Sequence, residues 1–88
     1  SLQDIIYLES LGNYIKLYST KENLPIIIYG SLSSITTELD KNQFLQVHRS
    51  YIVNTKKIKT TTPKSVTMSN DEIIPVGRKY QILLNPLL

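Results

Sequence analysis

Two arginines, each in a short apolar segment, carry the chemistry most easily recognised in this chain. Arg49 lies in segment 46–54, directly after His48, the only histidine of the chain. Arg78, the only other arginine, lies in segment 74–80. An arginine presents a planar fork of donors that fits a phosphate or a guanine edge in a bidentate manner. Because apolar residues anchor both segments, we predict that the two arginines recognise a ligand and are not merely solvated charges.

Composition limits the other kinds of chemistry. The chain has 88 residues, which predicts one domain with a single core. It has no cysteine and one histidine, so disulfide scaffolds, thiolate metal sites and histidine zinc cages are excluded. No apolar run reaches the roughly 18 residues that span a bilayer, and no secretory signal pattern begins the chain. We therefore expect a cytoplasmic, bacterial-type soluble domain with no metal, no cofactor and no membrane partner.

Catalysis finds little support in the sequence. The only adjacent pair of carboxylates is Asp71–Glu72, in a predicted hairpin where a solvated turn explains it better. There is no glycine-rich phosphate loop and no nucleophile with a positioned base. We predict that the chain has no catalytic residue and is not an enzyme.

The charge is distributed unevenly. The net charge is +3, but residues 1–44 carry −2 and residues 45–88, which contain both arginines, carry +5. Such asymmetry indicates an anionic partner, most simply nucleic acid. On charge alone, a basic surface without a partner is an equally good interpretation.

The hydrophobic pattern predicts mainly β-structure. Alternation in segment 14–18 places Ile15 and Leu17 toward the core, and Tyr14 and Tyr18 toward solvent together with Lys16. Short apolar or β-branched runs predict strands at residues 4–8, 14–18, 26–29, 58–61, 66–68 and 73–76. Residues 44–47 are expected to be extended, and residues 51–53 to form a short buried segment after a bend at residues 48–50.

Two segments have helical spacing. Ser31 is a suitable N-cap for a short amphipathic helix that ends near residues 41–42. After Gly77, residues 78–84 are expected to form one or two helical turns, stopped by the Asn85–Pro86 pair.

In order and spacing, these motifs resemble the LytTR family of DNA-binding domains, which are output domains of many bacterial two-component response regulators. The resemblance covers residues 4 to about 80 and rests on segments 4–9, 12–15, 44–54 and 74–80, with Leu32 and Leu39 in the helix and Ile58 beyond it. It implies an elongated, mainly β fold of small, mostly antiparallel sheets with one short amphipathic helix and a C-terminal helical turn. It also implies sequence-specific binding of double-stranded DNA at repeated sites, by loops inserted into the major groove.

The chain departs from the family pattern at its start. Family domains usually begin with another strand before the position of Asp4, and an upstream receiver domain is also absent from residues 1–88. We therefore expect one LytTR-like domain, trimmed at the N-terminus, whose first sheet has an exposed edge. An unpaired edge favours pairing with a second copy, which predicts a weak homodimer.

The resemblance implies DNA contacts in three places. The first is the predicted turn at Gly12–Asn13 with Tyr14 and Lys16 beyond it, where Asn13 suits an adenine edge and Lys16 a phosphate. The alternative is that Asn13 only accommodates the turn and Tyr14 is a half-exposed strand residue. We favour contact.

The second place is His48–Arg49–Ser50. Groove contact is favoured for Arg49, whereas a structural, hydrogen-bonded role is the better interpretation of His48. Ser50 either supports a phosphate contact or caps the next turn.

The third place is Arg78–Lys79. Cations in the first turn of a helix oppose its macrodipole, so stability alone does not explain them. A bound anion would reconcile the two cations with the free N–H groups of the turn. We favour DNA contact for both residues.

Two other classes of function remain open. A non-catalytic interaction module would pair through exposed sheet edges and would tolerate loss of Arg49 and Arg78. A binder of RNA or single-stranded DNA would use Tyr14 and Tyr18 as stacking platforms. The latter ranks last, because no dense basic groove surrounds these tyrosines in the sequence.

Overall fold

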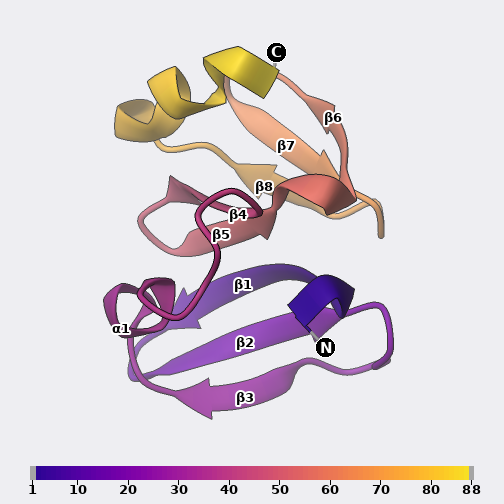
Figure 1. The fold of residues 1–88 in the computed structure, drawn as a ribbon, viewed down its shortest axis with the longest axis vertical. Helices are drawn as coiled ribbons and strands as arrows, with labels where there is room; N and C mark the ends of the chain where they lie inside the picture. Colours follow the sequence, from indigo (N-terminus) through magenta and orange to yellow (C-terminus); the bar gives the residue numbers. More distant parts are fainter. Residues whose placement is uncertain (1, 88) are drawn as a thin grey trace.

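The protein consists of a five-stranded antiparallel sheet and a smaller three-stranded antiparallel sheet (Figure 1). The computed structural model describes residues 2–87, and side chains are described for residues 2–84. The strands of the larger sheet are β1 (Ile5–Leu11), β2 (Tyr14–Ser19), β3 (Ile26–Tyr29), β4 (Phe44–His48) and β5 (Tyr51–Asn54). Their order is β3-β2-β1-β5-β4, so β1 lies in the middle.

The smaller sheet and four short helical segments complete the fold. The sheet contains β6 (Ile58–Thr61), β7 (Ser65–Met68) and β8 (Ile73–Pro75), in that order. The helical segments are η1 (Leu2–Asp4), α1 (Leu32–Thr36), η2 (Thr55–Lys57) and η3 (Arg78–Leu87). The mainly β fold of small antiparallel sheets predicted from the sequence is confirmed. Its principal extents are 31 × 24 × 21 Å.

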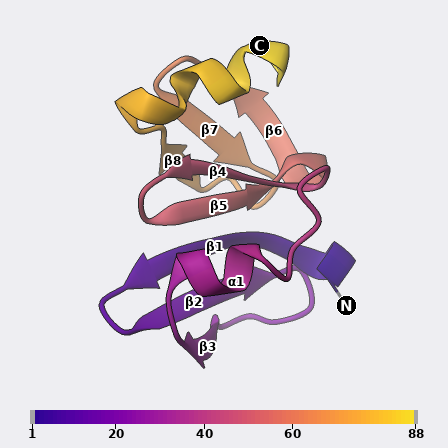
Figure 2. The same cartoon turned by 60° about the vertical axis from the view of Figure 1, so that its left-hand side comes forward.

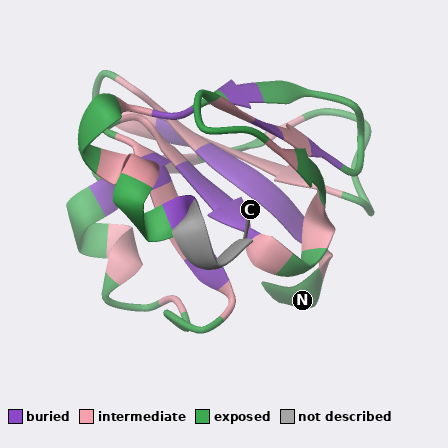
Figure 3. Ribbon diagram, turned by 90° about the horizontal axis from the view of Figure 1, so that it is seen from above, coloured by how far each residue is buried: buried purple, intermediate pink, exposed green. Residues whose placement is uncertain are grey.

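The hydrophobic interior is divided between the two faces of the larger sheet, whereas the sequence led us to expect a single core. On one face, helix α1 covers β1 and β2 (Figure 2). The buried residues of this cluster are Ile5, Leu8, Ile15, Leu32, Phe44 and Ile52. The second sheet and η3 cover the other face, where the buried residues are Ile6, Tyr7, Val47, Val53, Val66, Met68, Ile74, Val76 and Leu84. In Figure 3 the central strands form a buried band surrounded by exposed loops.

A β-bulge allows β1 to serve both clusters. The pairing with β2 shifts between Ile5 and Tyr7, so that Ile6 is the additional residue. Ile6 and Tyr7, although adjacent, both join the cluster under the second sheet, while Ile5 and Leu8 join the cluster under α1. All four side chains are buried, as expected for a strand covered on both faces.

The predicted outward orientation of Tyr18 is wrong. Alternation does separate Tyr18 from Ile15 and Leu17, but its face of the sheet is covered by the second layer. The ring of Tyr18 stacks on that of Tyr7, with centroids 4.4 Å apart. The two rings form part of the packed interface between the layers.

Helix α1 begins as predicted and ends earlier. Ser31 is the N-cap and forms a capping box with Ser34. The helix ends at Thr36, five residues before position 41. Thr36 and Thr37 donate their hydroxyl hydrogens back to the carbonyl oxygens of Ser33 (3.0 Å) and Ser34 (2.9 Å), respectively. Such back-bonding and β-branching both weaken continuation of a helix.

Two further expectations are corrected at the ends of the chain. β1 is paired on both sides, with β2 and β5, so the exposed edge is not at the first strand. The outer strands of the larger sheet are β3 and β4. At the other end, η3 is a 3₁₀-helix that continues through the Asn85–Pro86 pair to Leu87. Three residues per turn place its apolar side chains differently from an α-helix.

Asn54 is a buried polar side chain that joins three elements. It is fully buried, donates from Nδ2 to the carbonyl oxygen of Ile5 (2.8 Å) and accepts from the N–H of Lys56 (3.0 Å). It thereby connects the start of β1, the end of β5 and the turn of η2.

We expect Asn54→Ala to lower the free energy of unfolding by roughly 1–3 kcal/mol, because it removes the hydrogen bond to the carbonyl oxygen of the buried Ile5 and the bond from the N–H of Lys56. Urea denaturation measures the loss. Asn42→Ala is the matched control, because the Asn42 side chain is exposed and should change stability by no more than about 0.5 kcal/mol. Equal stability of both variants would contradict this role.

Candidate nucleic-acid interface

The turn between β4 and β5 presents Arg49 at the surface. The pairing of these strands shifts between Gln46 and His48, so Val47 is the additional residue of a bulge, a feature that often redirects a neighbouring side chain. His48 accepts a hydrogen bond at Nδ1 from the N–H of Ser50 (3.1 Å), which closes the turn. Arg49, at the tip between them, is exposed.

A second segment attaches to the same bulge. The N–H of Gly77 donates to the carbonyl oxygen of Val47 (2.8 Å), and the N–H of Tyr80 donates to the carbonyl oxygen of Gly77 (2.9 Å). A Cβ atom on Gly77 would lie 3.0 Å from Cδ2 of Tyr80 and 3.6 Å from Cα of His48. A side chain at position 77 would therefore crowd the ring of Tyr80 but would make only ordinary contact with β4.

The Gly77 attachment brings together two sites that the sequence placed on separate loops. A hollow of about 360 Å³ is lined by His48, Arg49, Gly77, Arg78, Lys79 and Tyr80. The three cations among these residues are all exposed. Without a bound anion, three positive charges around one hollow repel each other, whereas a phosphate or a base edge with acceptor atoms would be attracted.

The third predicted contact lies at the same end of the larger sheet but outside this hollow. Gly12, with φ 62°, and Asn13 form the turn between β1 and β2. The N–H of Ser10 donates to the carbonyl oxygen of Ser50 (2.8 Å), which ties this hairpin to the Arg49 turn. In both ribbon views the β1–β2 turn, the β4–β5 turn and the start of η3 lie on the left (Figures 1 and 2). We call this end of the molecule the basic end.

Of the three residues predicted to contact DNA near the β1–β2 turn, only Asn13 is exposed. Asn13 is exposed, and its carbonyl oxygen accepts from the N–H of Gly30 (2.9 Å). The ring of Tyr14 is half-buried and meets Tyr29 edge to face, with centroids 6.5 Å apart. Lys16 is half-buried and lies opposite Glu9 in the β1–β2 pairing.

Glu9 belongs to a polar cluster that sequence reasoning missed. Its Oε2 accepts from the hydroxyl of Tyr51 (2.9 Å), and its Oε1 accepts from that of Tyr18 at a longer 3.5 Å. Burial, and secondly the hydrogen bond to Glu9, raise the pKa of Tyr51 to about 12. Burial also raises the pKa of Tyr7 beside them. The sequence signal that could have indicated this cluster is the alternation that places Tyr7 and Glu9 on one face of β1.

The same cluster supports the Arg49 turn from beneath. The ring of Tyr51 lies edge to face with that of His48, with centroids 5.5 Å apart. His48 is thus held by a ring contact as well as by its bond from Ser50, and these contacts support the structural interpretation of His48. Arg49 itself projects from a turn that is fixed on both sides.

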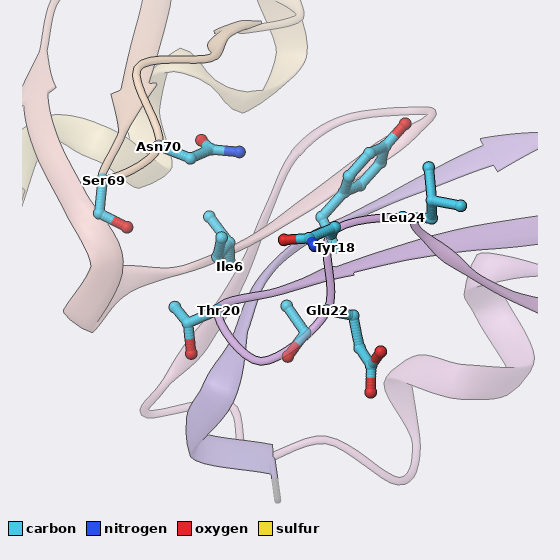
Figure 4. A pocket seen from close by; sticks show the side chains of 9 residues that line it. Ile6, Tyr18, Thr20, Glu22, Leu24, Ser69 and Asn70 are labelled. Atoms are coloured by element: carbon cyan, nitrogen blue, oxygen red, sulfur yellow. The ribbon is translucent and has the colours of Figure 1, made fainter.

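Other basic or concave regions do not combine a hollow with several exposed cations. Lys59 forms an ion pair with Asp71 (2.5 Å) in which both side chains are more than half exposed, so its contribution is small. A hollow of about 410 Å³ lies near the opposite end of β2 (Figure 4). Its lining residues are Ile6, Tyr18, Ser19, Thr20, Glu22, Asn23, Leu24, Ser69 and Asn70. With one carboxylate and no cation, this hollow is unsuited to a polyanion.

Within residues 2–87, no helix has the length and apolar character needed to cross a membrane. The same residues contain no group of three or more His, Cys, Asp or Glu side chains arranged to hold a metal ion.

The fold and the basic end define a small β-rich domain of the nucleic-acid-binding class. Comparison with known proteins then identifies the family: the model of the LytTr DNA-binding domain matches residues 1–88, and the chain belongs to this family.

Two relatives agree with this assignment. A solved chain described as the LytTr DNA-binding domain of a methyl-accepting/DNA response regulator from Bacillus cereus superposes with a TM-score of 0.82 at 29% identity. The match covers 97% of this chain and 81% of that one. An uncharacterized response regulatory protein of Vibrio cholerae is 34% identical over 67 residues, covering 70% of this chain. The match spans only 24% of the length of the Vibrio protein.

We expect Gly77→Ala to destabilise the domain by roughly 1–3 kcal/mol, because the added methyl group would overlap the ring of Tyr80. In a Tyr80→Ala background most of this cost should disappear, since the ring is no longer present. Urea denaturation of the four combinations gives the coupling energy.

Gly12→Ala provides the contrast. At Gly12 nothing lies within 4 Å of an added Cβ, but φ is positive. Its cost of roughly 1–2 kcal/mol should therefore be the same with or without Tyr80. If Gly77→Ala were equally costly in both backgrounds, the proposed overlap would be refuted.

Proposed function

We propose that residues 1–88 form a single domain that binds double-stranded DNA sequence-specifically through the basic end, with turns entering the major groove. One observation carries the proposal: Arg49, Arg78 and Lys79 surround a single hollow in a domain of a DNA-binding family. An arginine fork fits a guanine edge in the major groove, and a lysine suits a phosphate.

Individual roles follow from exposure and hydrogen bonding. Arg49 and Arg78 are assigned to base edges or to a shared phosphate, and Lys79 to the backbone. Asn13 is assigned to a neighbouring base, with Lys16 and Tyr14 as supporting contacts at the edge of the interface. We assign His48 to orienting the turn, and the hydroxyl of Ser50 to a supporting phosphate contact.

We further propose that the domain is the output part of a bacterial transcriptional response regulator that acts in the cytoplasm. The two relatives, both named as response regulators or parts of them, support this placement. The proposed partners are DNA with repeated sites and an upstream receiver domain in the full-length protein. Self-association through a sheet edge is proposed to be weak. We assign the domain no catalytic step and no cofactor.

The competing proposal is a protein-interaction module that uses an exposed sheet edge. It is favoured by the exposed apolar side chains of β3, among them Ile27 and Tyr29. The two proposals differ in a simple respect: an interaction module tolerates loss of Arg49 and Arg78, whereas a DNA-binding domain does not.

Binding to duplex DNA should weaken steeply with salt. Each neutralised phosphate releases condensed counterions, so log affinity should fall linearly with log salt, with a slope near −0.9 for every phosphate contacted. A titration of the isolated domain against duplex DNA over a range of salt concentrations measures the slope. A flat dependence, or no binding at low salt, would rule out the DNA-binding proposal.

Loss of either arginine should alter base preference. Arg49→Ala and Arg78→Ala should each cost roughly 1–3 kcal/mol on the preferred site and relax base choice at particular positions. Because both residues line one hollow, the double variant should lose less than the sum of the single losses. Affinities for a panel of single-base operator variants, first obtained by selection from a random duplex pool, provide the measurement.

Lys57→Ala is the matched control for charge. Lys57 lies in η2, outside the hollow, so its loss should weaken binding slightly and uniformly. All three variants should unfold within about 0.5 kcal/mol of the parent protein. If both arginine variants kept the parental base preferences, the arginines would be phosphate clamps, and base recognition would have to come from Asn13, Tyr14 and His48.

A further inference from the structure

Strand β3 is an outer strand with apolar side chains exposed. Ile26, Ile27 and Tyr29 are 44%, 47% and 83% exposed, respectively. Open, apolar strand edges favour pairing with another strand, and proteins usually protect them with charges, proline or a covering segment.

The other three outer strands have such protection. In β4, the carbonyl oxygen of Val47 is occupied by the N–H of Gly77. β8 ends with Pro75, which has no N–H to donate to another strand. β6 carries the charged Lys59. In β3 itself there is neither a charge nor a proline, since Pro25 precedes its first residue.

The hydrogen-bond pattern shows which backbone groups of β3 point away from the sheet. The N–H of Gly30 donates to the carbonyl oxygen of Asn13, so Gly30 and Asn13 are a hydrogen-bonded pair of the β2–β3 ladder. This pair lies one position beyond the pair of Tyr29 and Tyr14. Because such pairs alternate along antiparallel strands, Ile28 also faces β2. The N–H and C=O groups of Ile27 and Tyr29 are therefore directed outward.

We propose that β3 is a self-pairing edge, at which two copies of the domain join antiparallel about a two-fold axis at Ile28. In this register, Ile27 of each copy lies opposite Tyr29 of the other. Each of these pairs exchanges two hydrogen bonds, so every outward group of the two residues is satisfied. The paired side chains, one β-branched and one aromatic, are a favourable cross-strand combination.

Charge identifies a second copy as the occupant. Residues 23–37 contain no Lys, Arg, Asp or Glu, so no charged side chain of β3 itself opposes a second copy; the charge paired beside it is Lys16 of β2, opposite Ile27. The net charge of +3 on the domain would otherwise oppose association. The edge is only four residues long, so the contact is far smaller than the roughly 800 Å² per partner of a standard interface, and the dimer is weak.

The geometry of this dimer has a consequence for DNA binding. This consequence rests on the proposed function, whereas the pairing of β3 does not. β3 runs toward the basic end, since Tyr29 lies opposite Tyr14 at the start of β2. Antiparallel pairing reverses the second copy, so the two basic ends face opposite directions. Such a dimer holds two duplex segments instead of two neighbouring sites on one face of a duplex.

Sedimentation of the domain without DNA, from micromolar to millimolar concentration, tests the pairing. The apparent mass of the parent protein should rise toward that of a dimer only at the upper end. Ile27→Lys should remain a monomer throughout, because it places a charge opposite Tyr29. Ile73→Lys is the matched control: Ile73 is an isoleucine of β8 that is 67% exposed, and this variant should associate like the parent protein. A parent protein that stays monomeric at millimolar concentration, or equal association of both variants, would overturn the proposal.

Cross-linking tests the register, and the absence of native cysteine makes it clean. Ile28→Cys places two thiols across the two-fold axis, within reach of a disulfide. Ile26→Cys, on the same face, separates the thiols by about 13 Å at roughly 3.3 Å per residue. Under mild oxidation the first variant should form a covalent dimer much faster than the second. Equal rates would overturn the register.

A capture assay tests the consequence for DNA. Domain bound to an immobilised duplex should retain a second, labelled duplex, and Ile27→Lys should abolish this retention while binding to a single duplex is unchanged. If the parent protein did not bind even a single duplex, the proposed function would be refuted, while the result on pairing would still stand. Retention by Ile27→Lys equal to that of the parent would overturn the two-duplex arrangement.

Discussion

The burial of β1 on both of its faces is the constraint on which the rest of the structure depends. Ile5, Ile6, Tyr7 and Leu8 are buried in succession, and the bulge at Ile6 distributes them between two hydrophobic clusters. Burying such side chains contributes roughly 1.5–3 kcal/mol each. α1 and the second sheet both pack against this one strand and its neighbours. The turns at the basic end are therefore carried by the most firmly held part of the fold.

At the basic end, the packing of the chain determines where the charged side chains lie. The hydrogen bond between Gly77 and Val47 brings two segments of the basic half of the chain together, which concentrates positive charge around one hollow. A carboxylate, Glu9, lies on β1 of the same larger sheet, outside the hollow. It accepts hydrogen bonds from Tyr51 and Tyr18. Charge-assisted bonds of this kind stabilise the carboxylate where it is and fix the tyrosine that supports His48.

Most of the elements could be predicted from the sequence, because each depends on local periodicity and on turn residues. Most of the strands follow from short apolar or β-branched runs, and Ser31 was a sufficient signal for the start of α1. The end of α1 was missed because hydroxyl groups of consecutive threonines compete with helix continuation. The error at Tyr18 has a different origin: alternation assigns a side chain to a face, but only the tertiary fold decides whether that face is covered.

The individual residues of the candidate site could be predicted from the sequence, but their assembly around one hollow could not. Arg49 and Arg78 stood out by residue type and by their apolar neighbours. That they share a hollow depends on the backbone hydrogen bond between Gly77 and Val47, which has no local signature. Likewise, the position of β1 inside the sheet follows from its pairing with β5, which no local pattern indicates.

The pairing of β1 with β5 also sets the order in which the domain can fold. The β1–β2 hairpin closes over a two-residue turn, whereas Tyr7 of β1 meets Val53 of β5 across about half of the chain. Contacts so distant in sequence carry a large loop-closure entropy and slow the search for the native topology. During synthesis, the Gly12–Asn13 turn can form as soon as β2 has left the ribosome. The Arg49 turn is fixed to it only when β5 arrives, and the bond between Gly77 and Val47 adds the start of η3 later still, so the basic end is completed late in folding.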